Sequence, residues 1–151
     1  MNSSFTVDDF CLADPLSLPM VDRAIAAALL YAQEKGLQVS VAVVDAGGHL
    51  LGFSRIPGAS LHSIDIAQDK AWTAVSFSMP TCALANLMRH ADEHVRQCLI
   101  SRPRMVPMGG AFPLMLGSRL LGAIGVSGAS EEQDAGCATA GYDAIRSAEA
   151  P

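Results

Sequence analysis

The spacing of apolar and polar positions predicts a helix at the start of the ordered chain. From Pro15 to Lys35 apolar residues such as Val21 and Ile25 recur on one helical face. Ser17 can cap this helix at its beginning, and Gly36 can end it. We therefore expect an amphipathic helix over this segment.

Two pairs of strands follow at different points of the chain. Residues 39–55, VSVAVVDAGGHLLGFSR, are β-branched and aliphatic on either side of an Asp-Ala-Gly-Gly turn, which predicts a hairpin. Residues 112–117, FPLMLG, and 119–128, RLLGAIGVSG, form a second such pair around Gly117 and Ser118. Hairpins join antiparallel strands, so we expect an antiparallel sheet.

Three more helices are predicted from the remaining periodic segments. The first covers Ser60–Phe77, the second begins at Pro80 and runs towards Val95, and an irregular stretch follows over residues 101–108. The last begins with a Ser-x-x-Gln capping box at Ser130 and runs to about Arg146. The helices alternate with hairpins rather than with single parallel strands, which predicts helices on the faces of an antiparallel sheet.

The whole pattern therefore predicts one α/β (α+β) domain with three layers, α/β/α. We expect it to span residues 1–151, with residues 1–14 as a loosely ordered N-terminal arm. A chain of this length buries about two thirds of the surface of its unfolded form, so it needs no disulfide. Its four cysteines are scattered, and we expect them to be reduced and mostly buried.

Composition and charge narrow the range of partners. Half of the residues are apolar and 17% are charged, which is more apolar surface than one small core can bury, so we expect a homo-oligomer. The net charge of -5 and the lack of a basic cluster argue against nucleic acid. No apolar run approaches the roughly 20 residues of a membrane span, and the N-terminus does not resemble a signal peptide. The expected location is the cytoplasm, without a membrane partner.

Four ordered segments resemble a known family. They are VSVAVVDAGGHLLGFSR, SIDIAQDKAWTAV, VPMGG and LLGAIGVSGASEEQDAGCATAG, and the resemblance extends over Leu18–Ile145. They are similar to the GlcG/HbpS-like family, which includes the C-terminal domain of the PduO corrinoid adenosyltransferases. The resemblance implies a profilin-like fold with a five-stranded antiparallel sheet, assembly as dimers, tetramers or octamers, and haem binding in some members. GlcG-like members resemble proteins of catabolic operons.

Lys70 is the first candidate for a functional residue. It shares a helical face with Ile66 and Ala67, where a lysine is costly unless its ammonium finds a partner. In one interpretation it binds a carboxylate or haem propionate of a ligand. In the other its stem packs while the ammonium reaches solvent or pairs with Asp45 or Asp134. The sequence leaves both open.

Histidines provide the second set of candidates. His62, with Ser63 beside it, stands in the first turn of the helix that carries Lys70, where an imidazole could bind a ligand or move a proton. The alternative is an exposed histidine without a role. His90 and His94 have the spacing that places two side chains on one helical face, but no third ligand is near in sequence. No metal site is expected.

Met108, Gly109 and Gly110 form the third candidate, directly before a strand. The two glycines let the backbone approach a ligand and present amide groups to an anion or carbonyl oxygen. Met105 and Met108 carry thioethers that can bind haem iron. The alternatives are a tight turn and methionines that fill gaps in the core.

These residues support three functional hypotheses. In the first, the protein binds haem or a related tetrapyrrole, Lys70 meets a propionate, and His62 or Met108 approaches the iron. In the second, a cofactor-independent isomerase, lyase or hydrolase acts on a small organic or aromatic acid, with Lys70 and the amides of Gly109 and Gly110 polarising it and His62 transferring a proton. In the third, the protein is a structural partner in an assembly. Whether a reaction is catalysed is left open.

Overall fold

The sheet has four strands in the part of the chain that can be described, residues 16–147 of a computed structural model. The predicted N-terminal arm, residues 1–14, lies outside this range. The strands are β1 (Ser40–Asp45), β2 (Leu50–Arg55), β3 (Ala111–Leu116) and β4 (Arg119–Ser127). They lie in the order β2-β1-β4-β3, and all neighbours are antiparallel.

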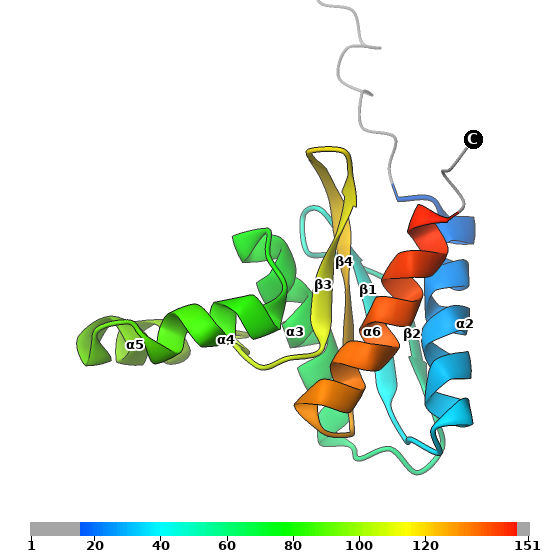
Figure 1. Ribbon diagram of the computed structural model, residues 1–151, viewed down its shortest axis with the longest axis horizontal. Coiled ribbons are helices and arrows are strands. Elements are labelled where there is room, and N and C mark those ends of the chain that lie inside the picture. The colour runs from blue at the N-terminus through cyan, green and yellow to red at the C-terminus, as the bar shows by residue number, and fades with distance from the viewer. Residues whose placement is uncertain (1–15, 148–151) are drawn as a thin grey trace, which may run out of the picture.

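Helices cover both faces of this sheet. The helices of the described residues are α2 (Leu18–Glu34), α3 (His62–Phe77), α4 (Thr81–Arg89), α5 (Glu93–Ile100) and α6 (Glu131–Arg146). Helices α2 and α6 pack side by side on one face, and α3 lies across the other (Figure 1). The predicted mixed α/β class, antiparallel sheet and layers are confirmed. The fifth strand implied by the resemblance is absent from residues 16–147.

The two faces of the sheet carry different residues because side chains alternate along a strand. Val41 and Val43 of β1 point into a large aliphatic core beneath α2 and α6. On the α3 side the sheet presents mostly small residues, and Ala123 packs with alanines of α3. At Gly125 even a methyl group would lie 2.2 Å from the backbone oxygen of Ala67. Glycine is therefore required for the close approach of α3.

The helix predicted from Pro80 towards Val95 is two helices. The first, α4, ends at Arg89, and α5 begins after Asp92, whose backbone angles (φ -51°, ψ 137°) are not helical. The expectation that His90 and His94 share one helical face is therefore wrong, because a turn separates them. The capping box predicted at Ser130 is confirmed.

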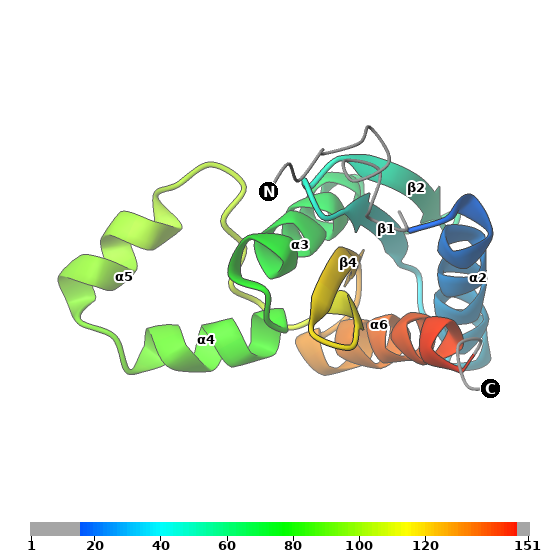
Figure 2. The same cartoon turned by 90° about the horizontal axis from the view of Figure 1, so that it is seen from above.

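The segment from Thr81 to Met108, here called the α4–α5 arm, extends away from the sandwich (Figure 2). Helix α5 contains no buried residue. In the described range no helix has the length and apolar character needed to cross a membrane.

Candidate functional site

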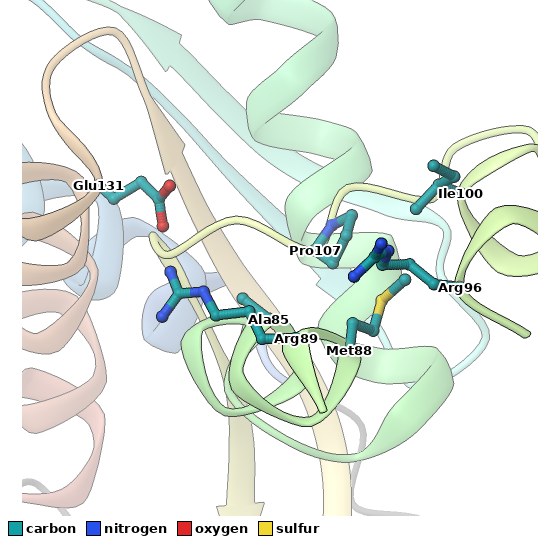
Figure 3. Close-up of a pocket in the computed structure, with 7 residues that line it drawn as sticks. All are labelled: Ala85, Met88, Arg89, Arg96, Ile100, Pro107 and Glu131. Carbon is teal, nitrogen blue, oxygen red and sulfur yellow. The ribbon is translucent and has the colours of Figure 1, made fainter. Parts of the chain in front are cut away.

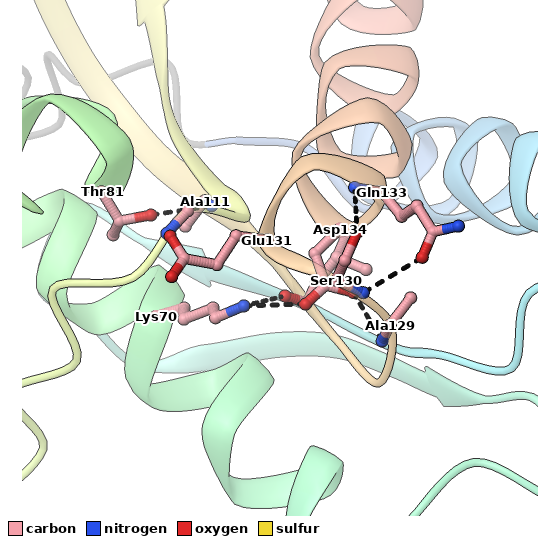
Figure 4. Close-up of polar contacts among 10 residues, drawn as sticks. Lys70, Thr81, Ala111, Ala129, Ser130, Glu131, Gln133 and Asp134 are labelled. Atoms are coloured by element: carbon pink, nitrogen blue, oxygen red, sulfur yellow. Dashed lines mark hydrogen bonds and ion pairs between the residues drawn. The ribbon is translucent and has the colours of Figure 1, made fainter.

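Lys70 lies at the junction of three elements on the α3 face of the sheet. Its side chain is 1% exposed, and its Nζ is 2.9 Å from Oδ2 of Asp134 in α6 and 3.1 Å from the backbone oxygen of Val126 in β4 (Figure 4). Of the two carboxylates considered as partners, the structure pairs it with Asp134. The polar partners satisfy the buried ammonium, which would otherwise be costly.

The second oxygen of Asp134 fixes the start of α6. Oδ1 accepts a hydrogen bond of 3.0 Å from the backbone N–H of Ala129, and the side chain of Ser130 caps the same helix. Asp134 therefore connects α3, the end of β4 and the first turn of α6. A change at Lys70 or Asp134 is expected to disturb all three.

The glycine turn lies directly against this ion pair. Gly110 is buried and has φ +127°, and a Cβ there would lie 2.8 Å from Nζ of Lys70 and 2.7 Å from the oxygen of Val126. The N–H of Gly109 donates a 2.9 Å hydrogen bond to Oε2 of Glu131. The amide that the sequence offered to a ligand is thus engaged by a carboxylate of the protein itself. We call Lys70, Gly109, Gly110, Glu131 and Asp134 the Lys70 cluster.

Of the other predicted site residues, Met108 directly precedes Gly109, whereas His62 and Ser63 lie at the start of α3. His62 is exposed at the first position of α3, eight residues and about 12 Å along the helix axis from Lys70. The Ser63 hydroxyl lies 2.8 Å from that of Ser40 and 2.6 Å from the backbone oxygen of Ser60. Met108 is 44% exposed. The structure thus gathers Lys70, Gly109 and Gly110 but not the histidine, and the ligand roles of all six residues remain predictions.

A pocket of about 200 Å³ adjoins the Lys70 cluster and shares Glu131 with it. It lies between the arm and the start of α6 (Figure 3). Its lining residues are Ala85, Met88, Arg89, Arg96, Ile100, Pro107 and Glu131. Sequence reasoning missed it because its two arginines are distant from Glu131 along the chain.

A larger groove surrounds Trp72 on α3. One side is a pocket of about 430 Å³, lined mainly by residues 99–105 and α3, and the other is a pocket of about 310 Å³ beneath the β1–β2 turn. Trp72 and Ser76 line both. We call their union the Trp72 groove. The one tryptophan of the chain is the signal in the sequence that could have located this groove. Its ring packs against the β1–β2 turn, where a Cβ at Gly48 would lie 2.5 Å from it.

Polar contacts with α3 fix the wall of the Trp72 groove. Arg104 lies over the Trp72 ring, 4.9 Å from its centroid, and its Nε donates a 2.7 Å hydrogen bond to Asp69. The Thr73 hydroxyl accepts a hydrogen bond from the N–H of Val106 at 3.1 Å and lies 2.9 Å from the oxygen of Arg104. The loop over residues 101–108 is therefore held against α3 although it contains no helix or strand.

Within residues 16–147, the pKa values of the Cys137 thiol and the Asp45 carboxyl group are shifted. Burial raises the pKa of the Cys137 thiol to about 11, and the negative charge of Asp134 adds to the shift. Partial burial opposes ionisation of Asp45, but hydrogen bonds from the backbone N–H groups of His49 and Gly47 outweigh it and lower its pKa. Neither group lies in the Trp72 groove.

The cysteines only partly follow the expectation of buried thiols. Cys137 is buried, but Cys82 and Cys98 on the arm are exposed, and Cys11 lies outside the described residues. All three described cysteines are free. Within residues 16–147 no three His, Cys, Asp or Glu side chains gather in a way that could hold a metal ion.

The family model described as "Haem degrading protein HbpS-like" matches residues 16–143, which is most of the chain. The chain belongs to the HbpS-like family. The resemblance found in the sequence is thereby confirmed. GlcG of Escherichia coli K12 is 34% identical to this HbpS-like chain over 112 residues, covering 74% of the chain and 81% of GlcG.

Other relatives of this HbpS-like chain include PduO and two solved structures. The corrinoid adenosyltransferase PduO of Citrobacter freundii is 32% identical over 130 residues, covering 86% of the chain but only 39% of PduO. HbpS of Streptomyces reticuli, crystallised as a double mutant, superposes with a TM-score of 0.81 at 33% identity, covering 95% of this chain and 92% of that one. A PduOC–haem complex gives 0.79 at 32%, covering 86% and 94%.

Proposed function

We propose that this HbpS-like protein binds haem or a related tetrapyrrole in the Trp72 groove. The observation that carries the proposal is the pair of adjoining pockets, about 430 and 310 Å³, that meet at Trp72 and Ser76. Each falls in the range of about 300–1,000 Å³ typical of ligand sites. A related structure at 32% identity is a haem complex, which supports this choice of ligand.

The side chains of the groove match the chemistry of a tetrapyrrole, which is a flat apolar ring with acidic substituents. Trp72 and Phe77 offer aromatic surface. Met105 offers a thioether to the iron. Arg102 offers a guanidinium group to a carboxylate, while Arg104 is already paired with Asp69. Bound haem would add an iron centre, and these residues would orient it and shield one face from water.

Lys70 has a different place in this proposal from the one expected of it. Its ammonium is buried and paired with Asp134, so it connects α3 with α6 rather than contacting a propionate. The same burial weakens the alternative of a cofactor-independent enzyme in which Lys70 polarises an organic acid. His62 and Met108 remain alternative iron ligands.

A haem titration followed at the Soret band tests the proposal. Met105→Leu is expected to shift the band and weaken binding about tenfold, because one coordinate bond is lost. Met20→Leu, on the opposite side of the sheet, is the matched control and should leave the titration unchanged. Affinity no tighter than that of serum albumin, or an unchanged spectrum in Met105→Leu, would reject the groove as the site. His62→Ala and Met108→Ala then show whether either residue is the ligand instead.

We also propose that the protein is a homo-oligomer of profilin-like sandwiches and that α5 lies in its interface. Val95 of α5 is exposed, and none of the eight residues of this helix is buried. Isolated helices shorter than about 12–15 residues are marginal in water, so packing against a second copy would explain its stability. Light scattering of the purified protein should give a mass of at least twice 15.8 kDa, and a monomeric mass would contradict the interface.

A further inference from the structure

We propose that the pocket between the arm and the start of α6 binds a small hydroxylated carboxylate. Nothing in the proposed haem function uses this pocket, whose lining residues are separate from those of the Trp72 groove. Its volume of about 200 Å³ is too small for a tetrapyrrole. At about 30 Å³ for each water molecule it has room for about six waters, which is the size of a short organic acid.

Two arginines give the pocket its preference for an anion. Arg89 comes from α4, and Arg96 comes from α5 beside Met88 and Pro107 (Figure 3). Arg96 forms an ion pair with Glu93 on its own helix, whereas Arg89 has no ion pair within the described residues. A guanidinium group binds a carboxylate through charge-assisted hydrogen bonds, often two at once. The carboxylates of the ligand are therefore assigned to these arginines.

Glu131 determines what the rest of the ligand must offer. Its Oε2 accepts the hydrogen bond from the N–H of Gly109, which fixes the carboxylate at the pocket wall. An ionised carboxylate has further lone pairs and no proton, so it can accept a hydrogen bond from a ligand but cannot donate one. It also repels a negative group placed beside it, so the carboxylates of the ligand must lie towards the arginines and not towards Glu131. A hydroxyl group near the ligand's carboxylate satisfies both conditions.

The remaining lining suits a short carbon chain. Met88 is 5% exposed, and Ala85, Ile100 and Pro107 complete an apolar wall. Apolar walls with a few convergent polar groups are the usual composition of small-molecule sites. A bare inorganic anion would leave these walls without contacts, so an organic acid is favoured over phosphate.

Calorimetric titration of the full chain with malate, succinate and inorganic phosphate tests the assignment. Malate and succinate differ by one hydroxyl group, which isolates the contribution of Glu131. Malate should bind saturably at millimolar concentration or below. Succinate and phosphate should each bind about tenfold more weakly than malate, which is the effect of losing one hydrogen bond to a charged group.

Variants then assign the contacts to residues. Arg89→Gln and Arg96→Gln should each weaken malate binding about tenfold or more. Glu131→Gln should reduce the preference for malate over succinate, since a neutral amide accepts a weaker hydrogen bond and repels an anion less. Arg23→Gln removes one exposed positive charge from α2, on the other side of the molecule, and should change nothing. Thermal unfolding of each variant verifies that it is folded.

Four results would overturn the proposal. The first three are no saturable malate binding, unchanged binding in both arginine variants, and a loss of equal size in Arg23→Gln, which would indicate a general effect of charge. The fourth is equal binding of malate and succinate, because the ligand would then not need the hydroxyl group that defines its proposed class. Because the pocket and the Trp72 groove share no lining residue, the haem titration of Arg89→Gln should match that of the unaltered protein, and either site can fail without the other.

Discussion

The two faces of the sheet are packed by different means. Under α2 and α6, Val41, Val43, Ile124 and other large aliphatic side chains fill the space between layers. Under α3, the sheet presents mostly small residues such as Ala123, so that helix and sheet are in close backbone contact. The buried Lys70 cluster connects α3 on this second face with the end of β4 and the first turn of α6. The packing under α2 and α6 thus depends on the volume of the side chains. The packing of α3 depends on the close approach of helix and sheet and on a charge pair.

This difference explains where function can be placed. The Trp72 groove lies against α3, and the small arginine pocket lies between the arm and the start of α6. A close-packed helix fixed by polar contacts gives defined geometry at such sites, whereas an aliphatic core mainly supplies stability. The comparison predicts that small changes on the α3 face cost more than larger ones beneath α2 and α6.

The largest effect is expected from Lys70→Met. The substitution keeps the apolar stem but leaves the buried carboxylate of Asp134 without its counterion. Removing one partner of a buried pair costs about 3–5 kcal/mol, and we expect that loss in the free energy of unfolding measured with urea.

A double variant separates the charge from the packing. In Lys70→Met with Asp134→Asn, no buried charge remains, and the introduced amide oxygen can still accept the N–H of Ala129. Most of the lost stability should return. If Lys70→Met alone is neutral, the α3 face does not depend on this pair and the contrast between the faces is wrong.

The sequence predicted the parts of the fold that depend on local pattern. The periodicity of Leu18–Glu34, the Asp-Ala-Gly-Gly turn and the capping box at Ser130 each have a local cause, and each appears where it was expected. The break between α4 and α5 was missed because Asp92 lies inside an otherwise helical pattern, and only its backbone conformation marks a new helix. A fifth strand came from family resemblance alone, without a periodic segment to support it.

The candidate site could be predicted only in part, for a physical reason. Lys70, Gly109 and Gly110 were selected because each is unusual in its local setting, and they do lie together. The Trp72 groove and the arginine pocket depend on the path of the arm, which long-range contacts such as that of Arg104 with Asp69 determine. The engagement of Gly109 by Glu131 has no local signal at all.

The smaller of the two stability effects is expected from Gly125→Ala, which adds one methyl group to the α3 face. Its Cβ would lie 2.2 Å from the oxygen of Ala67 and 2.7 Å from the nitrogen of Ala71, and neither backbone atom can rotate away. Overpacking of this kind costs about 1–3 kcal/mol in urea unfolding. The adjacent Ile124→Val, which removes one methylene group beneath α2 and α6, should cost about 0.5–1.5 kcal/mol. A larger loss for Ile124→Val than for Gly125→Ala would mean that volume governs both faces alike.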